Sequence, residues 1–269
     1  MGDWKRQDFS KIDIPQINRV LFYPRYDYPL KKNNHIKQVM IPVGNGGVIS
    51  SIWADVERPK ASILFFHGNG ELASEYTDIA DLFGQMSIRF ICVDYRGYGL
   101  SSDMPSISTM IYDAHDIFKY VLSKVNNTEE LILIMGRSLG CASALEIAAG
   151  YSDLIDGLII ESGFAETLPL LKTLGSDPDF LGIKEEDGLG NVDKIKKFSK
   201  PLLIIHAEDD FLIPIAQAEK LFEASNSLQK KFLKIPNAGH NDIFIAGLKN
   251  YLTAVKDLIS TAEKEKKLS

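Results

Sequence analysis

The stretch IMGRSLGCASA, residues 134–144, determines the predicted fold. An apolar run ends at Gly136, and a stretch of small residues begins at Gly140. The two glycines flank Ser138 in the pattern Gly-x-Ser-x-Gly. Between a buried strand and a helix, this pattern is typical of a nucleophile elbow, a turn so sharp that its flanking positions leave no room for a Cβ atom. We therefore predict that Ser138 lies on a strained turn at the carboxyl end of a strand.

Around this stretch, short apolar runs alternate with amphipathic stretches from about residue 40 onward. The runs are VISSIWADV, SILFFHG, FICVDYRG, LILIMGRS, GLIIESG, PLLIIHAEDD and KFLKIPNAGH. Most are almost continuously apolar, as expected for strands that are buried on both faces of a parallel sheet. The alternation predicts an α/β fold, with helices on both faces of a mostly parallel sheet. The first run alternates in polarity, so we expect it to form an antiparallel edge hairpin with HIKQVMIPV.

The 269 residues suit one α/β domain with modest additions. Residues 1–35 include an aromatic and proline-rich stretch, and we expect an irregular segment packed on the domain of residues 36–269. Residues 165–195 break the alternation of strands and helices with three short helical or turn fragments. A segment of this length without regular structure is uncommon unless it is functional, so we predict a small cap inserted at about 165–195.

Composition excludes several classes of protein. A net charge of −6 without a dense block of lysine and arginine argues against nucleic-acid binding. The two cysteines, Cys92 and Cys141, lie in apolar runs without the spacing of metal ligands, so we predict buried free thiols and a reducing compartment. The N-terminus lacks a secretory apolar core, and no apolar run approaches the length of a membrane span. We expect a cytoplasmic protein without a transmembrane segment; the sequence does not fix its oligomeric state.

A serine hydroxyl is a weak nucleophile at neutral pH and needs a positioned base, here a histidine in a later loop. The chain has five histidines. His240 lies in NAGHND, between the last predicted strand and the last predicted helix, where a loop can reach over the edge of the sheet. The others fit structural roles. His35 precedes the sheet, and His115 lies beside the apolar stripe of a helix. His67 and His206 lie at the ends of strands. We therefore predict that His240 is the base.

The base needs a carboxylate that fixes its tautomer and stabilises its charged form. The run IIHAEDDFLIP offers Glu208, Asp209 and Asp210 just after a strand. Asp210 is preferred because it precedes FLIP, where Pro214 can start the next helix. Asp209 stays a close alternative, and Glu161, at the end of the strand before the cap, is a more distant one.

A developing oxyanion needs two backbone donors. One is the amide of Leu139, directly after the serine. The other is predicted to be the amide of Asn69 in HGNGE, where Gly68 and Gly70 allow the backbone to approach a ligand closely. The alternative for HGNGE is a plain glycine turn.

Five segments together resemble the α/β-hydrolase superfamily of serine hydrolases, over about residues 35–262. They are FFHGNGE (65–71), VDYRGYGLS (93–101), GRSLG (136–140), DFLIP (210–214) and AGHND (238–242). HGNGE is similar to the oxyanion loop of monoacylglycerol-lipase-like members. DYRGYG with GHND is similar to the depalmitoylase-type and related bacterial members.

The resemblance implies an eight-stranded, mostly parallel sheet with a variable cap, and ester chemistry without metal or cofactor. Carried over by position, it implies these roles: nucleophile Ser138, acid Asp210, base His240, and oxyanion donors Asn69 and Leu139. It also implies structural roles, at the turn after the fourth strand, for Asp94, Arg96 and Gly97. The cap is shorter than in typical lipases, and Arg137 beside the serine identifies no subfamily.

The expected function is hydrolysis of a small-molecule carboxylic ester through an acyl-enzyme. The cap carries apolar side chains that could line an acyl pocket or simply pack against the domain: Leu168, Leu170, Leu171, Leu174, Phe180, Leu181, Ile183 and Leu189. It also carries seven acidic residues, which disfavour polyanionic substrates such as acyl-CoA. We therefore expect a neutral ester with a short-to-medium acyl chain. The alternatives are a thioesterase or protein-deacylating hydrolase and, in another class, a non-catalytic binding protein of the same fold.

Overall fold

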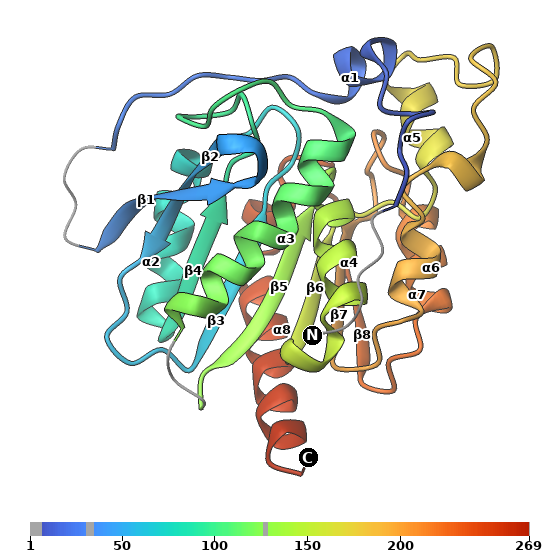
Figure 1. Cartoon of the computed structure of the whole chain (residues 1–269). Helices are drawn as coiled ribbons and strands as arrows, with labels where there is room; N and C mark the ends of the chain where they lie inside the picture. The colour runs from blue at the N-terminus through green and yellow to red at the C-terminus, as the bar shows by residue number, and fades with distance from the viewer. Residues whose placement is uncertain (1–6, 31–34, 126–128, 269) are drawn as a thin grey trace.

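A computed structural model of the chain describes residues 7–30, 35–125 and 129–268. In these ranges eight strands form one sheet, in the order β1-β2-β4-β3-β5-β6-β7-β8 (Figure 1). The strands are β1 (Ile36–Val43), β2 (Gly47–Ala54), β3 (Ala61–Phe66), β4 (Ile88–Val93), β5 (Leu131–Arg137), β6 (Gly157–Glu161), β7 (Leu202–Ala207) and β8 (Lys230–Ile235). β2 runs antiparallel to β1 and β4, and the other neighbours are parallel. The predictions of a mostly parallel sheet and of an antiparallel edge hairpin are confirmed.

Helices cover both faces of the sheet, as predicted. One face is covered by α3 (Ile107–Lys124), α4 (Gly140–Gly150), α6 (Asn191–Ile195) and α7 (Ile215–Ala224). The other is covered by α2 (Thr77–Gln85) and α8 (Ile243–Lys266) (Figure 1). None of the helices in the described ranges is long and apolar enough to cross a membrane. Both cysteines, Cys92 in β4 and Cys141 in α4, are buried free thiols, which confirms that prediction.

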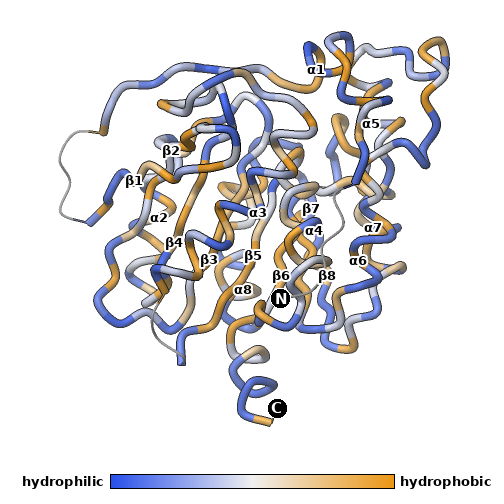
Figure 2. Tube along the Cα trace, viewed as in Figure 1, coloured by the Kyte–Doolittle hydropathy of each residue, from blue (hydrophilic) through white to orange (hydrophobic). Residues whose placement is uncertain are grey.

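The central strands contribute side chains to two hydrophobic cores, one on each face. Along β3, Leu64 and Phe66 belong to the core beneath α3 and α4, whereas Ile63 and Phe65 belong to the core beneath α2 and α8. Because both faces are buried, the central strands read as continuous apolar runs, visible as hydrophobic colours in Figure 2. The parallel register aligns the carboxyl ends of these strands at one edge, where Phe66 lies opposite Gly136.

The segment between β6 and β7 contains three short helices. They are α5 (Thr167–Thr173), a 3-10 helix at Glu185–Asp187, and α6. Residues 165–195 are called the cap segment from here on. Of the eight apolar side chains considered for an acyl pocket, four are buried in the core (Leu170, Leu171, Ile183 and Leu189), and three more are partly buried and pack against it (Leu168, Leu174 and Leu181). Phe180, by contrast, is 86% exposed. Packing against the domain therefore accounts for seven of the eight apolar side chains, and a role as a substrate cap stays a prediction.

Residues 7–30 include a helix, which corrects the expectation of an irregular segment. Pro15–Leu21 form α1, which lies beside α5 (Figure 1). Pro15 suits the first helical position because its fixed φ matches a helix and its missing N–H would have no partner there. Ile17 and Leu21 are buried in the core beneath α3 and α4, so they anchor the segment on the domain. Residues 1–6 and 31–34 lie outside the described residues.

Candidate active site

Ser138 occupies the turn between β5 and α4, at the carboxyl edge of the sheet. Its φ angle is +52°, a left-handed conformation that is strained for a residue with a side chain. The Ser138 amide donates to the carbonyl of Glu161, at 2.9 Å, which ties the turn to β6. A Cβ atom added at Gly136 would lie 2.5 Å from the carbonyl oxygen of Gly140. The predicted steric reason for the glycines is therefore present.

Gly140→Ala is expected to lower the free energy of unfolding by about 3 kcal/mol, because the new Cβ would overlap the backbone carbonyl oxygen of Phe66. Backbone cannot move aside as a flexible side chain can. Gly84→Ala in α2 is the matched control, since its Cβ would meet only Val56 Cγ2, at an ordinary 3.8 Å. It should be neutral or stabilising by up to about 1 kcal/mol. Denaturant unfolding measures both variants, and wild-type stability of Gly140→Ala would contradict the steric account.

Ser138, His240 and Asp210 meet at this edge. His240 lies in the loop between β8 and α8, and its Nε2 is 3.0 Å from the Ser138 hydroxyl oxygen. Its Nδ1 is 2.7 Å from an Asp210 carboxylate oxygen. With the neutral imidazole protonated on Nδ1, that nitrogen donates to Asp210, and Nε2 accepts the hydroxyl proton of Ser138. Three side chains far apart in the sequence thus form one hydrogen-bonded chain.

Asp210 follows β7 and is held by its own turn. The carboxylate oxygen Oδ1 accepts the amides of Leu212, at 3.0 Å, and Ile213, at 2.8 Å. Burial raises the pKa of Asp210, but hydrogen bonds from His240 and the Ile213 amide, with the nearby positive charge, together hold that pKa below its ordinary value. The carboxyl is therefore ionised at neutral pH and acts as an acceptor.

The alternative acids lie elsewhere. Asp209 is exposed, and its amide donates to the carbonyl of Ala238 at 3.0 Å. Glu161 is buried at the end of β6, where it accepts a hydrogen bond from Arg137 Nε at 3.1 Å and another from the Tyr251 hydroxyl at 2.5 Å. Of the acids considered from sequence, Asp210 is the one whose carboxylate contacts His240.

The two proposed oxyanion donors come from different segments at the carboxyl edge of the sheet. Leu139 directly precedes α4, and Asn69 lies in the loop after β3. Within the described ranges, neither backbone amide donates a hydrogen bond to the protein. The Asn69 side chain is engaged, because its Oδ1 accepts from the Tyr23 amide and the Tyr98 hydroxyl, both at 2.7 Å. The loop is therefore anchored by its side chain while its amide stays available.

Three of the other histidines contact partners outside the Ser138–His240–Asp210 chain. His67 contacts the carbonyl of Gly68 at 2.8 Å and Asp94 at 3.3 Å. His115 contacts the Tyr151 hydroxyl at 3.0 Å. His206 contacts the carbonyl of Ile213 at 2.8 Å, and burial lowers its pKa, which favours the neutral form.

The turn after β4 is built as the resemblance implies. Asp94 accepts the Ala73 amide at 2.8 Å, and Gly97 has a φ of +74°. Arg96 pairs with both carboxylate oxygens of Asp113, at 2.6 and 2.9 Å. Among the residues that the structure describes, no group of three or more His, Cys, Asp or Glu side chains is arranged to hold a metal ion.

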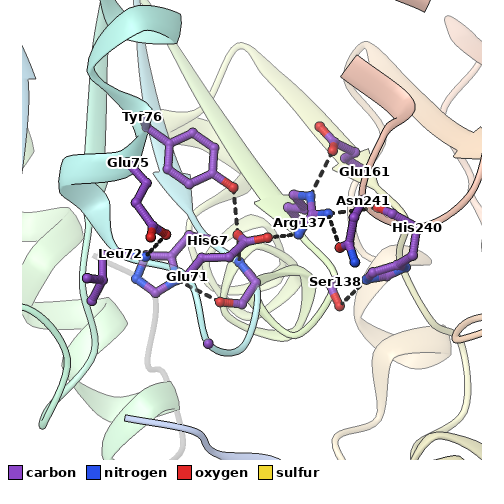
Figure 3. A network of polar contacts seen from close by, with 12 residues as sticks. His67, Glu71, Leu72, Glu75, Tyr76, Arg137, Ser138, Glu161, His240 and Asn241 are labelled. Carbon is purple, nitrogen blue, oxygen red and sulfur yellow. Dashed lines mark hydrogen bonds and ion pairs between the residues drawn. The ribbon is translucent and has the colours of Figure 1, made fainter. Parts of the chain in front are cut away.

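Arg137, for which no role was predicted, has its guanidinium at the centre of a polar network beside the serine (Figure 3). It contacts Glu71 from the loop after β3, Glu161 from the end of β6, and the loop of His240 and Asn241. The sequence signal for this network was weak: an arginine at the end of a buried strand, with one glutamate in the loop after β3 and another at the end of β6.

A cavity of about 300 Å³ lies behind Arg137, on the face covered by α2 and α8. The aromatic side chains in its wall include Phe65, Tyr76, Phe90 and Tyr251. Glu71 and Asn241 also line it, whereas Ser138 and His240 do not. The cavity is thus separated from the hydroxyl–imidazole pair by the Arg137 network.

Sequence comparisons place this chain near known hydrolase sequences. The family model described as serine aminopeptidase S33 matches residues 57–174, which include the loop after β3 and the Ser138 turn. Human alpha/beta hydrolase domain-containing protein 17B is 26% identical over 240 residues, covering 87% of this chain and 79% of the relative. Protein bem46 of Schizosaccharomyces pombe is 27% identical over 211 residues, covering 76% of this chain and 69% of the relative.

Solved structures share the architecture. The Pyrococcus furiosus esterase Pf2001 superposes with a TM-score of 0.68 at 17% identity, covering 87% of this chain and 98% of that one. The alpha/beta hydrolase GrgF from Penicillium sp. sh18 superposes with a TM-score of 0.68 at 16% identity, covering 85% and 99%. At such identities the likeness shows the fold alone, and it confirms the predicted fold class.

Proposed function

Because the chain belongs to the α/β-hydrolase superfamily, we propose that it is a serine hydrolase that cleaves carboxylic esters through an acyl-enzyme intermediate. The observation that carries the proposal is the hydrogen-bonded chain from Asp210 through His240 to Ser138. A hydroxyl in contact with an imidazole that a carboxylate orients is the arrangement that activates a serine.

Acylation begins when His240 Nε2 takes the hydroxyl proton of Ser138 and the freed Oγ attacks the ester carbonyl carbon. The carbonyl oxygen becomes an oxyanion, which accepts hydrogen bonds from the amides of Asn69 and Leu139. The N-terminus of α4 adds a favourable dipole at the same position. Asp210 keeps the imidazole in the correct tautomer and stabilises its charged form.

Collapse of the tetrahedral intermediate breaks the ester bond, and protonated His240 gives its proton to the leaving alcohol. A water molecule then gives a proton to His240 and attacks the acyl group. The second tetrahedral intermediate releases the carboxylic acid, and His240 returns a proton to Ser138. No group outside these five residues is needed for proton balance.

The cap segment supports a neutral substrate. Its acidic residues repel polyanions: Glu166, Asp177, Asp179, Glu185, Glu186, Asp187 and Asp193. Because seven of the eight apolar side chains considered for an acyl pocket pack into or against the core, little apolar surface is left for a long chain. We therefore propose a small ester with a short-to-medium acyl chain. The second candidate is a thioester or acyl-protein substrate, which the similarity of DYRGYG and GHND to depalmitoylase-type members favours.

Labelling with a fluorophosphonate probe tests the proposal. The wild type is expected to react covalently at Ser138, and Ser138→Ala is expected to stay unlabelled. A panel of acyl esters and thioesters of graded length then measures kcat/KM, with a maximum at short-to-medium oxygen esters. A folded wild-type chain that fails to label would favour the non-catalytic binding class, and a maximum at thioesters would favour the second candidate.

A further inference from the structure

The Arg137 side chain ends β5 and is 9% exposed. Its guanidinium has five N–H donors in a rigid plane and donates four hydrogen bonds. Nε donates to Glu161, which is opposite Arg137 in the β5–β6 register. The two terminal nitrogens point to two different loops, and both loops supply residues to the proposed chemistry (Figure 3).

One terminal nitrogen, Nη1, donates to Glu71. The second carboxylate oxygen of Glu71 accepts the amide of Gly68, at 2.7 Å, and the hydroxyl of Tyr76, at 2.6 Å. Glu71 therefore closes the turn that contains Asn69, the proposed oxyanion donor. Arg137 fixes the rotamer of Glu71 and, through it, the direction of that turn.

The other terminal nitrogen, Nη2, donates to the backbone carbonyl of His240 at 2.7 Å and to Asn241 Oδ1 at 3.1 Å. A bond to the carbonyl of His240 holds its main chain, and the main chain determines where the imidazole meets Ser138. The residue directly before the nucleophile therefore holds the loop of the base.

We infer that Arg137 is a positioning residue, which holds the loop of Gly68–Glu71 and the loop of Gly239–Asp242 in one fixed geometry around Ser138. Stability alone is a poor reason for this network. Burying a cation with two carboxylates costs desolvation, and apolar side chains of similar volume often stabilise a protein as well or better. The planar guanidinium contacts three segments at once and so fixes their relative positions, and the proposed acyl transfer needs such precise positions.

The inference rests on the proposed function, and two measurements distinguish a failure of the inference from a failure of the proposed function. The first is kinetic: kcat and KM for a p-nitrophenyl ester, with kcat expressed per serine titrated by the fluorophosphonate probe. The second is hydrogen–deuterium exchange in residues 68–71 and 239–242, which needs no activity. Unfolded material affects neither reading, because titration counts competent sites and both are made far below the melting temperature.

Arg137→Gln is expected to reduce kcat per titrated site by about tenfold to a hundredfold with KM changed by less than about threefold, because misplaced groups lose transition-state contacts more than substrate binding. Exchange should rise in both loops. Arg137→Lys should recover only part of kcat, since a point charge cannot contact Glu71, Glu161 and the His240 carbonyl together.

Two further variants sharpen the test. Arg89→Gln is the matched control, because Arg89 Nη1 pairs with buried Glu130 at 2.7 Å near the amino ends of the strands. It should lower the melting temperature while kcat per site stays within about twofold of wild type and both loops keep their exchange rates. Glu71→Gln keeps the side-chain shape and should raise exchange in residues 68–71 without raising it in residues 239–242.

Wild-type kcat per site in Arg137→Gln, or unchanged exchange in either loop, would overturn the inference. If Arg137→Gln fails to fold, Arg137→Lys carries both readings, and Glu71→Gln tests the link to residues 68–71 alone. If the wild-type serine does not react with the probe, the proposed function fails, while exchange still decides whether Arg137 holds both loops.

Discussion

Ser138→Ala is expected to abolish ester turnover, with kcat lowered by about 10⁶-fold, because the proposed acyl-enzyme forms on the Ser138 hydroxyl. The variant should fold normally, since the hydroxyl contributes one hydrogen bond, to His240. His240→Ala in the Ser138→Ala background should then cost little more, because residues that act as a unit give non-additive losses.

Initial rates with a p-nitrophenyl ester measure this effect. Ser143→Ala is the matched control: Ser143 is a buried serine of α4, and its hydroxyl is 3.4 Å from the carbonyl of Met110. Its kcat should stay within about twofold of wild type, as for a neutral change away from the site. More than about 1% of wild-type turnover in Ser138→Ala would remove Ser138 as the nucleophile.

Asp210→Asn is expected to lower kcat by about 10⁴-fold while KM changes little. An amide in place of the carboxylate can donate to Nδ1, which favours the wrong tautomer and leaves no acceptor for the proton of Ser138. The lowered pKa of Asp210 keeps the wild-type carboxylate ionised throughout the neutral range, so the loss should not depend on pH there.

Asp209→Asn is the matched control for this prediction, because Asp209 is adjacent in sequence, has the same charge and is exposed. Its kcat should stay within about threefold of wild type. Steady-state kinetics of the two variants distinguish the two acids that the sequence left open. A large loss in Asp209→Asn with little loss in Asp210→Asn would reverse the assignment.

Much of the fold could be predicted because its signals are local. SILFFHG and LILIMGRS are apolar throughout, and they form β3 and β5 with both faces buried. Gly136 and Gly140 flank a turn that has room only for hydrogen atoms, so the position of the elbow could be predicted from sterics. The proximity of Ser138, Asp210 and His240 could also be predicted, because parallel strands bring the loops at their carboxyl ends together.

What escaped prediction depends on contacts between distant segments. The Arg137 network joins Glu71, Glu161 and the His240 loop, and no spacing in the sequence indicates that these groups meet. Helix α1 has seven residues, too few to be stable alone, so its stability comes from the burial of Ile17 and Leu21. The role of the cap segment could not be predicted for a similar reason, because the sequence pattern of its leucines is the same whether they contact a ligand or the core.

Because the thiols of Cys92 and Cys141 are buried, thioester cleavage can be measured with a reagent that reacts with free thiols. Burial raises the pKa of Cys92 and of Cys141 well above the usual range, so neither forms the reactive thiolate at neutral pH. A chromogenic disulfide such as Ellman's reagent can therefore be present during the reaction without modifying the folded chain. Every thiol that the reagent detects then comes from the substrate. The thiol released from a thioester can therefore be followed continuously, and the blank with enzyme but no substrate should be near zero.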